Sequence, residues 1–508
     1  MLPEDALLNI FRHYLCASPQ FWPTLSHVCQ RWRQIVFTSP LGLDLRLYCT
    51  YGMPVLRALD YWPALPIVVQ YGGSPTLDPP APEDEYNIVA ALKHSDRVSS
   101  IGLTITTSLL EKLSAIEKPF SRLEELVLRS LDNTQLTLPN TLRWGTRLRS
   151  LHSTRIAFPS LPQLLSSSEN LVDLQLHEIP SIGYLSPKAF ANALSGMPQL
   201  QSLSLHFLSP ASRPSHIGIS PLPGERVALP ALSHFSFRGT SEYLNKLVTR
   251  IDAPRLGDIQ VMFFNQLIFH ISQLGQFIDR IEMQKSHRRV DIESFERTIS
   301  ICFTRPGAPT RLKLQVSCDQ LDWQLSSITQ IWDQLSPPLS CVETLGICTT
   351  QRSTRQDDMD GEQWLELIRA FGDAKDFHVV GELATDILRA LHSVDGGHTT
   401  MLPSLHTLIV PELGPMRGSL WEAVESFTTS RRLSGRPVEV YPPPSNFPGL
   451  DVNKGKPSTP QQYSCTVCDV AFTNRQGFDG RNGDKHMPRK VCLYCGLFKW
   501  SQARKYLF

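Results

Sequence analysis

The chain has 508 residues, of which 41% are hydrophobic, enough for more than one hydrophobic core. Lys and Arg total 49 and Asp and Glu total 48, which leaves a formal net charge of only +1. This balance gives no global electrostatic reason to expect nucleic acid or an acidic membrane as the main partner, although it leaves room for a local basic patch.

The beginning of the chain does not have the charge pattern of a secretory signal. It reads MLPEDALLNIF, with Glu4 and Asp5 where a signal would carry Lys or Arg. The most apolar stretch, LGDIQVMFFNQLIFHI from Leu256, includes Asp258 and Gln260 and indicates a buried strand followed by a turn or helix. We expect a soluble protein of the cytoplasm, the nucleus or both.

Two amphipathic helices are predicted in the first forty residues. In LPEDALLNIFRHYL, residues 2–15, an apolar face has helical spacing, and the acids after Pro3 favour a helix start. In LSHVCQRWRQIVFTSP, residues 25–40, helical spacing predicts one continuous helix with Leu25, Cys29 and Trp32 on one face. A core of this size is marginal alone and gains from docking on a partner.

These two segments resemble an F-box. The resemblance rests on the pattern Leu-Pro-x-Glu/Asp at the start, met here by Leu2, Pro3 and Asp5, on Ile-Phe further on, and on Leu-x-x-Val-Cys-x-x-Trp in the second segment. It implies a three-helix module that binds the Skp-type adaptor of cullin–RING ubiquitin ligases. It also implies that eight residues lie at or beneath the adaptor surface: Leu2, Pro3, Ile10, Phe11, Leu15, Val28, Cys29 and Trp32. The alternative is a plain helical hairpin that caps the rest of the fold.

A repeated pattern, apolar-x-x-apolar-x-apolar, follows this module. Eight copies begin at Val98, Leu123, Leu171, Leu200, Leu232, Leu256, Val342 and Leu405, and a degraded copy begins at Leu148. Between 98 and 256, spacings range from 23 residues (148 to 171) to 32 residues (200 to 232), near the period of leucine-rich repeats.

Each copy predicts a strand, because apolar residues alternate in its last four positions. Helical stretches such as SPKAFANALSGM lie between copies, so we expect an irregular solenoid with a parallel sheet on its concave side. The stretch 275–340 has only weak matches, such as LKLQV at Leu312. With the N-terminal module, the chain resembles the F-box/leucine-rich-repeat proteins abundant in mushroom-forming fungi.

The residues between the buried positions of these strands are candidates for binding a target protein. They are Glu124, Glu125, Arg129, Asp173, Gln175, His177, Gln201, Ser204, His206, Ser236, Arg238, Asp258 and Gln260. The alternative for each residue is a solvated face without a partner.

The eleven cysteines fall into two groups. Seven are scattered and are predicted to be reduced core residues: Cys16, Cys29, Cys49, Cys302, Cys318, Cys341 and Cys348. Four form two Cys-x-x-Cys pairs near the C-terminus: Cys465, Cys468, Cys492 and Cys495. Four thiolates in such pairs suit tetrahedral structural zinc.

The zinc ligand set stays open between two arrangements. Either the four cysteines share one ion in a ribbon-like site, which we favour, or His486 joins Cys465 and Cys468 in one finger and a second begins at Cys492. Basic and aromatic residues surround these positions, so the tail is predicted to bind either nucleic acid or protein.

The sequence therefore predicts an α/β chain with four parts: a helical F-box module at 1–48, an irregular leucine-rich-repeat solenoid at 49–440, a Pro-rich linker at 441–462, and a zinc-binding tail at 463–508. It contains no Gly-rich phosphate loop and no Gly-x-Ser-x-Gly elbow, so we expect no enzyme. The expected function is that of a ubiquitin-ligase substrate receptor. The alternative is a zinc-dependent nucleic-acid or chromatin binder with a vestigial F-box.

Overall fold

The computed structural model divides the chain into two compact units, residues 1–443 and 444–508. In the first unit it describes residues 2–441 with gaps, of which the longest are 72–80, 131–135, 139–144, 211–225, 282–287, 305–310, 336–341, 350–360, 396–400 and 411–416. In the second unit it describes four strands of two residues each. No helix in these described parts is long and apolar enough to cross a membrane.

The first unit begins with three helices and a short 3-10 turn: α1 (Glu4–Ala17), η1 (Pro19–Phe21), α2 (Trp22–Val28) and α3 (Gln30–Thr38). The prediction of one helix across 25–40 was wrong, because Cys29 has extended backbone, with φ −159° and ψ 169°. Arg33 Nε donates to the carbonyl of Ser26 at 2.9 Å and satisfies an acceptor that the end of α2 leaves open.

The helices pack against the segments that lead into the first two strands of the sheet. Trp22 donates its indole N–H to the carbonyl of Arg46 at 2.7 Å. The rings of Trp22 and Phe37 meet Trp62 edge to face, at centroid distances of 4.8 Å and 4.5 Å. The helices and the sheet thus share one hydrophobic core.

Within the described residues, sixteen strands form one sheet. In spatial order they are β1 (Leu47–Cys49), β2 (Ile67–Tyr71), β3 (Val98–Ile105), β4 (Glu125–Ser130), β6 (Ser150–Thr154), β8 (Asp173–Ile179), β9 (Ser202–Phe207), β11 (His234–Gly239), β13 (Asp258–Phe263), β16 (Arg311–Ser317), β15 (Thr298–Thr304), β14 (Arg289–Phe295), β17 (Thr344–Thr349), β18 (Asp376–Gly381), β19 (Thr407–Ile409) and β20 (Glu439–Tyr441).

The sheet is parallel except at β15, which runs antiparallel to both β14 and β16. The expected parallel sheet is therefore present except within 275–340, where the repeat pattern is weak. A tight hairpin joins β14 to β15, and Phe295 pairs with Thr298 across it. Parallel pairing resumes on both sides, between β13 and β16 and between β14 and β17.

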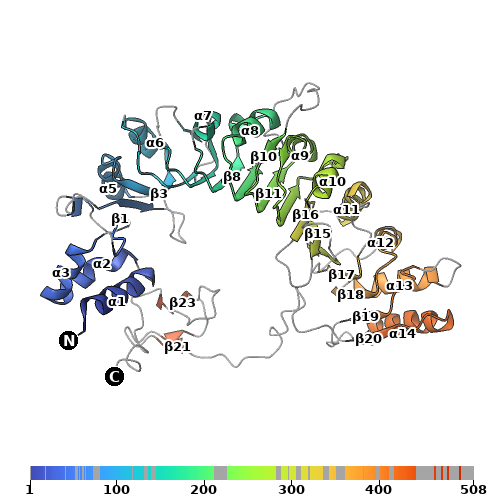
Figure 1. Cartoon of the computed structure of the whole chain (residues 1–508). Coiled ribbons are helices and arrows are strands. Elements are labelled where there is room, and N and C mark those ends of the chain that lie inside the picture. The colour runs from blue at the N-terminus through green and yellow to red at the C-terminus, as the bar shows by residue number, and fades with distance from the viewer. Residues whose placement is uncertain are drawn as a thin grey trace. The chain divides into compact units, whose positions relative to one another are not determined.

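Helices connect the strands and lie along one face of the sheet (Figure 1). They are α5 (Pro82–Leu92), α6 (Thr107–Ser114), α7 (Leu161–Ser166), α8 (Pro187–Leu194), α9 (Ser241–Val248), α10 (Ser272–Asp279), α11 (Leu321–Leu335), α12 (Gly361–Arg369), α13 (Ala384–Asp395) and α14 (Arg417–Leu433). The start of α8 shows the local cause: Pro187 sits in the first turn, and Ser186 Oγ accepts from the backbone N–H of Ala189 at 3.2 Å.

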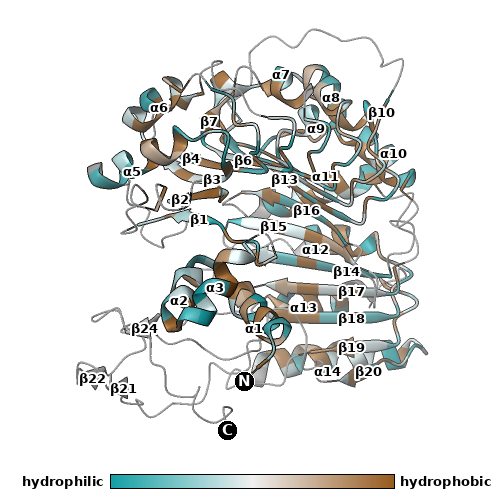
Figure 2. Cartoon of the chain, turned by 60° about the vertical axis from the view of Figure 1, so that its left-hand side comes forward, coloured by the Kyte–Doolittle hydropathy of each residue, from teal (hydrophilic) through white to brown (hydrophobic). Residues whose placement is uncertain are grey.

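The core lies between these helices and the sheet. Leu174 and Leu176 of β8 are buried there, whereas Asp173 and Gln175 point to the helix-free face. In β17 and β18 this alternation is lost, because consecutive residues of both strands are buried; Figure 2 shows these strands with their hydrophobic segments. Only four of the described scattered cysteines are buried; Cys16 and Cys29 are exposed, so for these two the prediction of a core position was wrong.

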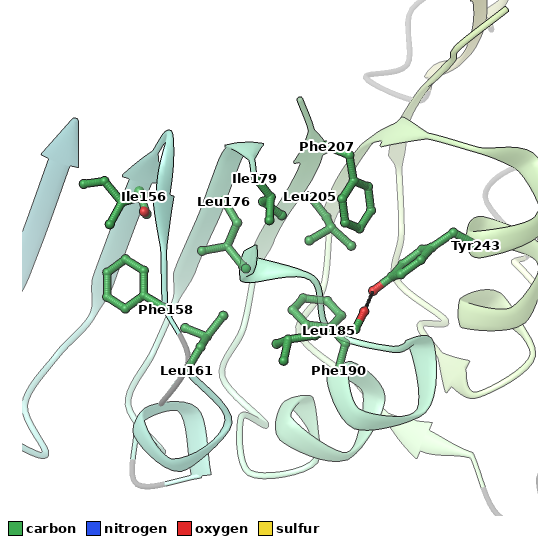
Figure 3. A pocket seen from close by; sticks show the side chains of 12 residues that line it. Ile156, Phe158, Leu161, Leu176, Ile179, Leu185, Phe190, Leu205, Phe207 and Tyr243 are labelled. Carbon is green, nitrogen blue, oxygen red and sulfur yellow. Dashed lines mark hydrogen bonds between the residues drawn. The ribbon is translucent and has the colours of Figure 1, made fainter. Parts of the chain in front are cut away.

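A small apolar cavity remains in this core, between strands β6, β8 and β9 and helices α7, α8 and α9 (Figure 3). Its lining includes Phe190, Phe207 and Tyr243, and the Tyr243 hydroxyl donates to the carbonyl of Leu185 at 3.0 Å. It encloses about 20 Å³, room for about one water molecule. The Ser153 hydroxyl borders it without a hydrogen-bond partner among the described residues, and most of the other lining side chains are apolar, so we interpret the cavity as a packing gap.

Candidate functional site

Large apolar side chains are exposed on the N-terminal helices. One of them, Phe37 of α3, packs against Trp62, and the others are Leu2, Ile10, Tyr14, Phe21 and Val28, which we call the N-terminal apolar surface. Ile10 is 46% exposed and Val28 is 59% exposed. Ile10 and Tyr14 lie one helical turn apart on α1, beside the buried face formed by Leu7, Phe11 and Leu15. Exposed apolar residues grouped in this way are typical of a protein-interaction site.

The eight residues predicted for adaptor binding separate into two layers. Leu2, Pro3, Ile10, Val28 and Cys29 are exposed. Phe11 and Leu15 are buried, and Trp32 is half-buried with its ring 4.8 Å from that of Phe11. The inner three support the helices, and only the outer five are exposed to solvent. Tyr14 and Phe21 belong to the same surface; helical spacing revealed Tyr14, but nothing in the sequence marked Phe21.

Two hydrogen bonds hold this surface together. Arg31 Nη2 donates to the carbonyl of Leu2 at 2.6 Å, which ties the first residues to α3. The hydroxyls of Tyr14 and Thr24 lie 3.3 Å apart and connect α1 to α2.

The helix-free face of the sheet carries a second set of polar side chains. Parallel register brings equivalent positions of β4, β6, β8, β9, β11 and β13 side by side. Glu125, Asp173 and Asp258 fall near the strand starts, Gln175, Ser204, Ser236 and Gln260 in the middle, and Arg129, His177, His206 and Arg238 near the ends.

The acids near the strand starts are held by neighbours on the same face. His152 Nε2 lies 2.5 Å from Asp173 Oδ2, and Gln175 Nε2 donates to the same oxygen at 3.0 Å. Burial alone would raise the pKa of Asp173, but the hydrogen bonds, led by that of His152, lower it below its usual value. Ser100 donates to Glu125 at 2.9 Å, and Gln260 donates to Asp258 at 3.0 Å.

The two histidines near the strand ends are stacked. Their ring centroids lie 4.4 Å apart with an interplanar angle of 11°. His177 Nε2 lies 3.0 Å from Ser204 Oγ, and His206 Nε2 lies 2.8 Å from Ser236 Oγ. Burial, His177 and Arg238 together lower the pKa of His206 to about 4. Burial likewise lowers the pKa of His177, so both rings are neutral at pH 7.

Two of the candidate residues lie elsewhere. Glu124 and Gln201 precede their strands and do not alternate with buried strand positions. They line a shallow hollow at the edge of the sheet together with Arg147 and Arg149. The sequence pattern predicted both residues on the strand face, because it does not show at which residue each strand begins to pair with its neighbour.

A charged network on β14, β15 and β16 was not predicted. Arg289 makes a bidentate ion pair with Asp291, and Lys313 Nζ lies 3.1 Å from Glu293. Alternating charges in RVDIESF and RLKLQV were the available signal, but the repeat pattern did not cover them. Because these charges are paired with one another, the network is best explained as stabilising the hairpin.

The side chains of the predicted zinc ligands lie outside the residues that the structure describes. Cys465, Cys468, Cys495 and His486 lie outside the described residues, and of Cys492 only the backbone, in β24 (Val491–Cys492), is described. Among the side chains that the structure does describe, no group of three or more His, Cys, Asp or Glu could hold a metal ion.

Comparison with known families identifies the N-terminal helices. Residues 1–44 match the F-box domain model. No curated protein sequence matches the chain. One similar solved structure is the leucine-rich repeat-containing protein LegL7 from Legionella pneumophila, which is 11% identical; the match covers 76% of this chain and 98% of that chain with a TM-score of 0.29. The chain thus carries an F-box domain at its N-terminus, followed by a mostly parallel sheet with helices on one face.

Proposed function

We propose that the chain is a substrate receptor of a Skp–cullin–F-box type ubiquitin ligase. Its F-box docks a Skp-type adaptor, and the helix-free face of its sheet holds a target protein. The observation that supports this most is the coincidence of the F-box match with the N-terminal apolar surface. Recruitment raises the effective concentration of the target near the ligase, so this chain needs no chemistry of its own.

The adaptor contact is tested by changing exposed residues, because truncating the buried Phe11 would damage the fold itself. Ile10→Asp and Val28→Asp place a charge in the proposed interface without removing core packing. Each is expected to weaken adaptor affinity at least tenfold by calorimetry, since an unpaired charge is costly to bury.

Tyr86→Ser provides the matched control. Tyr86 is a large, exposed aromatic residue on α5, outside the F-box, and its change is expected to leave adaptor affinity as it was. If the intact, folded chain binds no Skp-type adaptor, or if Ile10→Asp and Tyr86→Ser behave alike, the adaptor role is refuted.

We also propose that Cys465, Cys468, Cys492 and Cys495 hold one structural zinc ion. The donor chemistry fits, because four thiolates satisfy tetrahedral zinc. The backbone supports it too: β21 (Tyr463–Ser464) pairs antiparallel with β22 (Ala471–Phe472), so one short connection carries Cys465 and Cys468. Zinc would let this core-poor segment fold.

The purified chain is therefore expected to contain about one zinc per molecule by elemental analysis. Cys468→Ser and Cys495→Ser should each lower the zinc content by more than half, whereas Cys16→Ser should not change it. Absence of zinc would refute the site, and two zinc ions per chain would indicate two separate fingers.

A further inference from the structure

On the helix-free face, a line of side chains crosses five neighbouring strands near their C-terminal ends. We call Arg129, Thr154, His177, His206 and Arg238 the basic row. Register pairs Arg129 with Thr154, Thr154 with His177, and His206 with Arg238, and the stacked rings join His177 to His206. Strand spacing of about 4.8 Å puts the two arginines about 19 Å apart.

The two arginines differ from the other charges of this face. Glu125, Asp173 and Asp258 each accept a hydrogen bond from a neighbouring side chain. In contrast, no acidic side chain among the described residues lies within ion-pair distance of Arg129 or Arg238. The two arginines therefore keep donors available for an anionic partner, and they lie on the two outer strands of the basic row, β4 and β11.

Arg238 packs against an aromatic ring, and its buried Nε donor has no hydrogen-bond partner among the described residues. Its guanidinium lies 5.6 Å from the centroid of the Phe264 ring, and its Nε is buried without a hydrogen-bond partner within the described part of the chain. Leaving a buried donor unpaired costs free energy, which charge-assisted hydrogen bonds to the rest of the guanidinium would offset.

We propose that the basic row binds an extended acidic segment of the target, with one carboxylate at Arg129 and another at Arg238. This proposal rests on the proposed receptor function and specifies its target. A span of about 19 Å corresponds to about six residues of extended peptide. A phosphate dianion is best held by several convergent donors, whereas the row offers two separate single charges with neutral imidazoles between them.

Three labelled ten-residue peptides of Gly and Ser, acetylated and amidated at their ends, test this proposal. One carries Asp at its third and ninth positions, one carries Asp at its third and fourth positions, and one carries a single phosphoserine. Fluorescence anisotropy with the full chain at low ionic strength should show at least fivefold tighter binding of the first peptide, and added salt should weaken it.

Variants of the row locate the binding. Arg129→Gln and Arg238→Gln are each expected to weaken the first peptide about fivefold, whereas Arg238→Lys should retain most of the affinity. Arg122→Gln is the matched control, because Arg122 is exposed in the turn before β4 and outside the row. Equal binding of the two Asp peptides, tightest binding of the phosphoserine peptide, or an equal effect of Arg122→Gln would overturn the proposal.

Adaptor affinity of the same variants separates this proposal from the proposed function. All four should bind the adaptor as the parent chain does. If the parent chain binds the adaptor but does not prefer the first peptide, only the proposed role of the basic row is refuted. If the parent chain binds no adaptor, the receptor function is refuted.

Discussion

The stacked pair His177 and His206 shows what a single residue contributes on this face. Both rings are kept neutral by burial and by neighbouring cations, and each is oriented by a serine on the next strand. Alternation in the sequence identified both residues as candidates. It could not predict their stacking, because stacking depends on the register of β8 and β9, which shifts between Leu176 and Ile179.

The lowered pKa values make stability depend on pH. Below pH 6.5 the unfolded chain binds more protons at these histidines than the folded chain does, so the free energy of unfolding falls as pH drops from 6.5 toward the lowered pKa of His206, about 4. The melting temperature of the parent chain should drop between pH 7 and pH 4.5, and in His206→Gln this drop should be smaller by about 1–3 °C. The exposed His234 serves as control: if His234→Gln has the same effect, burial of His206 is not the cause.

Among the secondary-structure elements, the repeats were predictable and the exceptions were not. All eight copies of the pattern and the degraded copy at Leu148 lie on strands of the sheet, which confirms the prediction. The hairpin of β14 and β15 was missed because its pairing is set by contacts distant in sequence. One is Gln324 of α11, which donates to the carbonyls of Phe295 and Cys318 and accepts from Ser294.

Periodicity also failed at Cys29, for a different reason. The apolar residues before and after the break keep helical spacing, so the pattern continues although the backbone does not. A single extended residue leaves no periodic signal.

The side chain of Trp62 packs at the junction between the F-box helices and the sheet. It packs against Trp22 and Phe37, and its carbonyl accepts from the buried Arg97 at 2.6 Å. Trp62→Ala should lower the free energy of unfolding by about 2 kcal/mol, because two aromatic contacts are lost from a half-buried site.

Denaturant unfolding measures this loss, and Trp62→Phe is the matched control, expected to recover about half of it. If Trp62→Ala unfolds at the same denaturant concentration as the parent chain, the junction does not depend on this ring.

At the scale of the whole molecule, the first unit carries both proposed interaction surfaces, on the F-box and on the sheet. A single hydrophobic cluster runs from Leu7 of the F-box to Phe427 of α14 within the described residues. A target held on the sheet would therefore stay at a fixed position relative to the adaptor. The composition of the chain predicted several cores, but stacked repeats merge them into one.

The central claim is that this chain links a ligase to a target, and the most direct test is whether it assembles with the ligase. The chain, a Skp-type adaptor and a cullin are mixed and analysed by size exclusion with light scattering. We expect one complex whose mass is the sum of the three proteins, lost in Ile10→Asp. Elution of the folded chain alone, apart from an adaptor–cullin complex, would contradict the account.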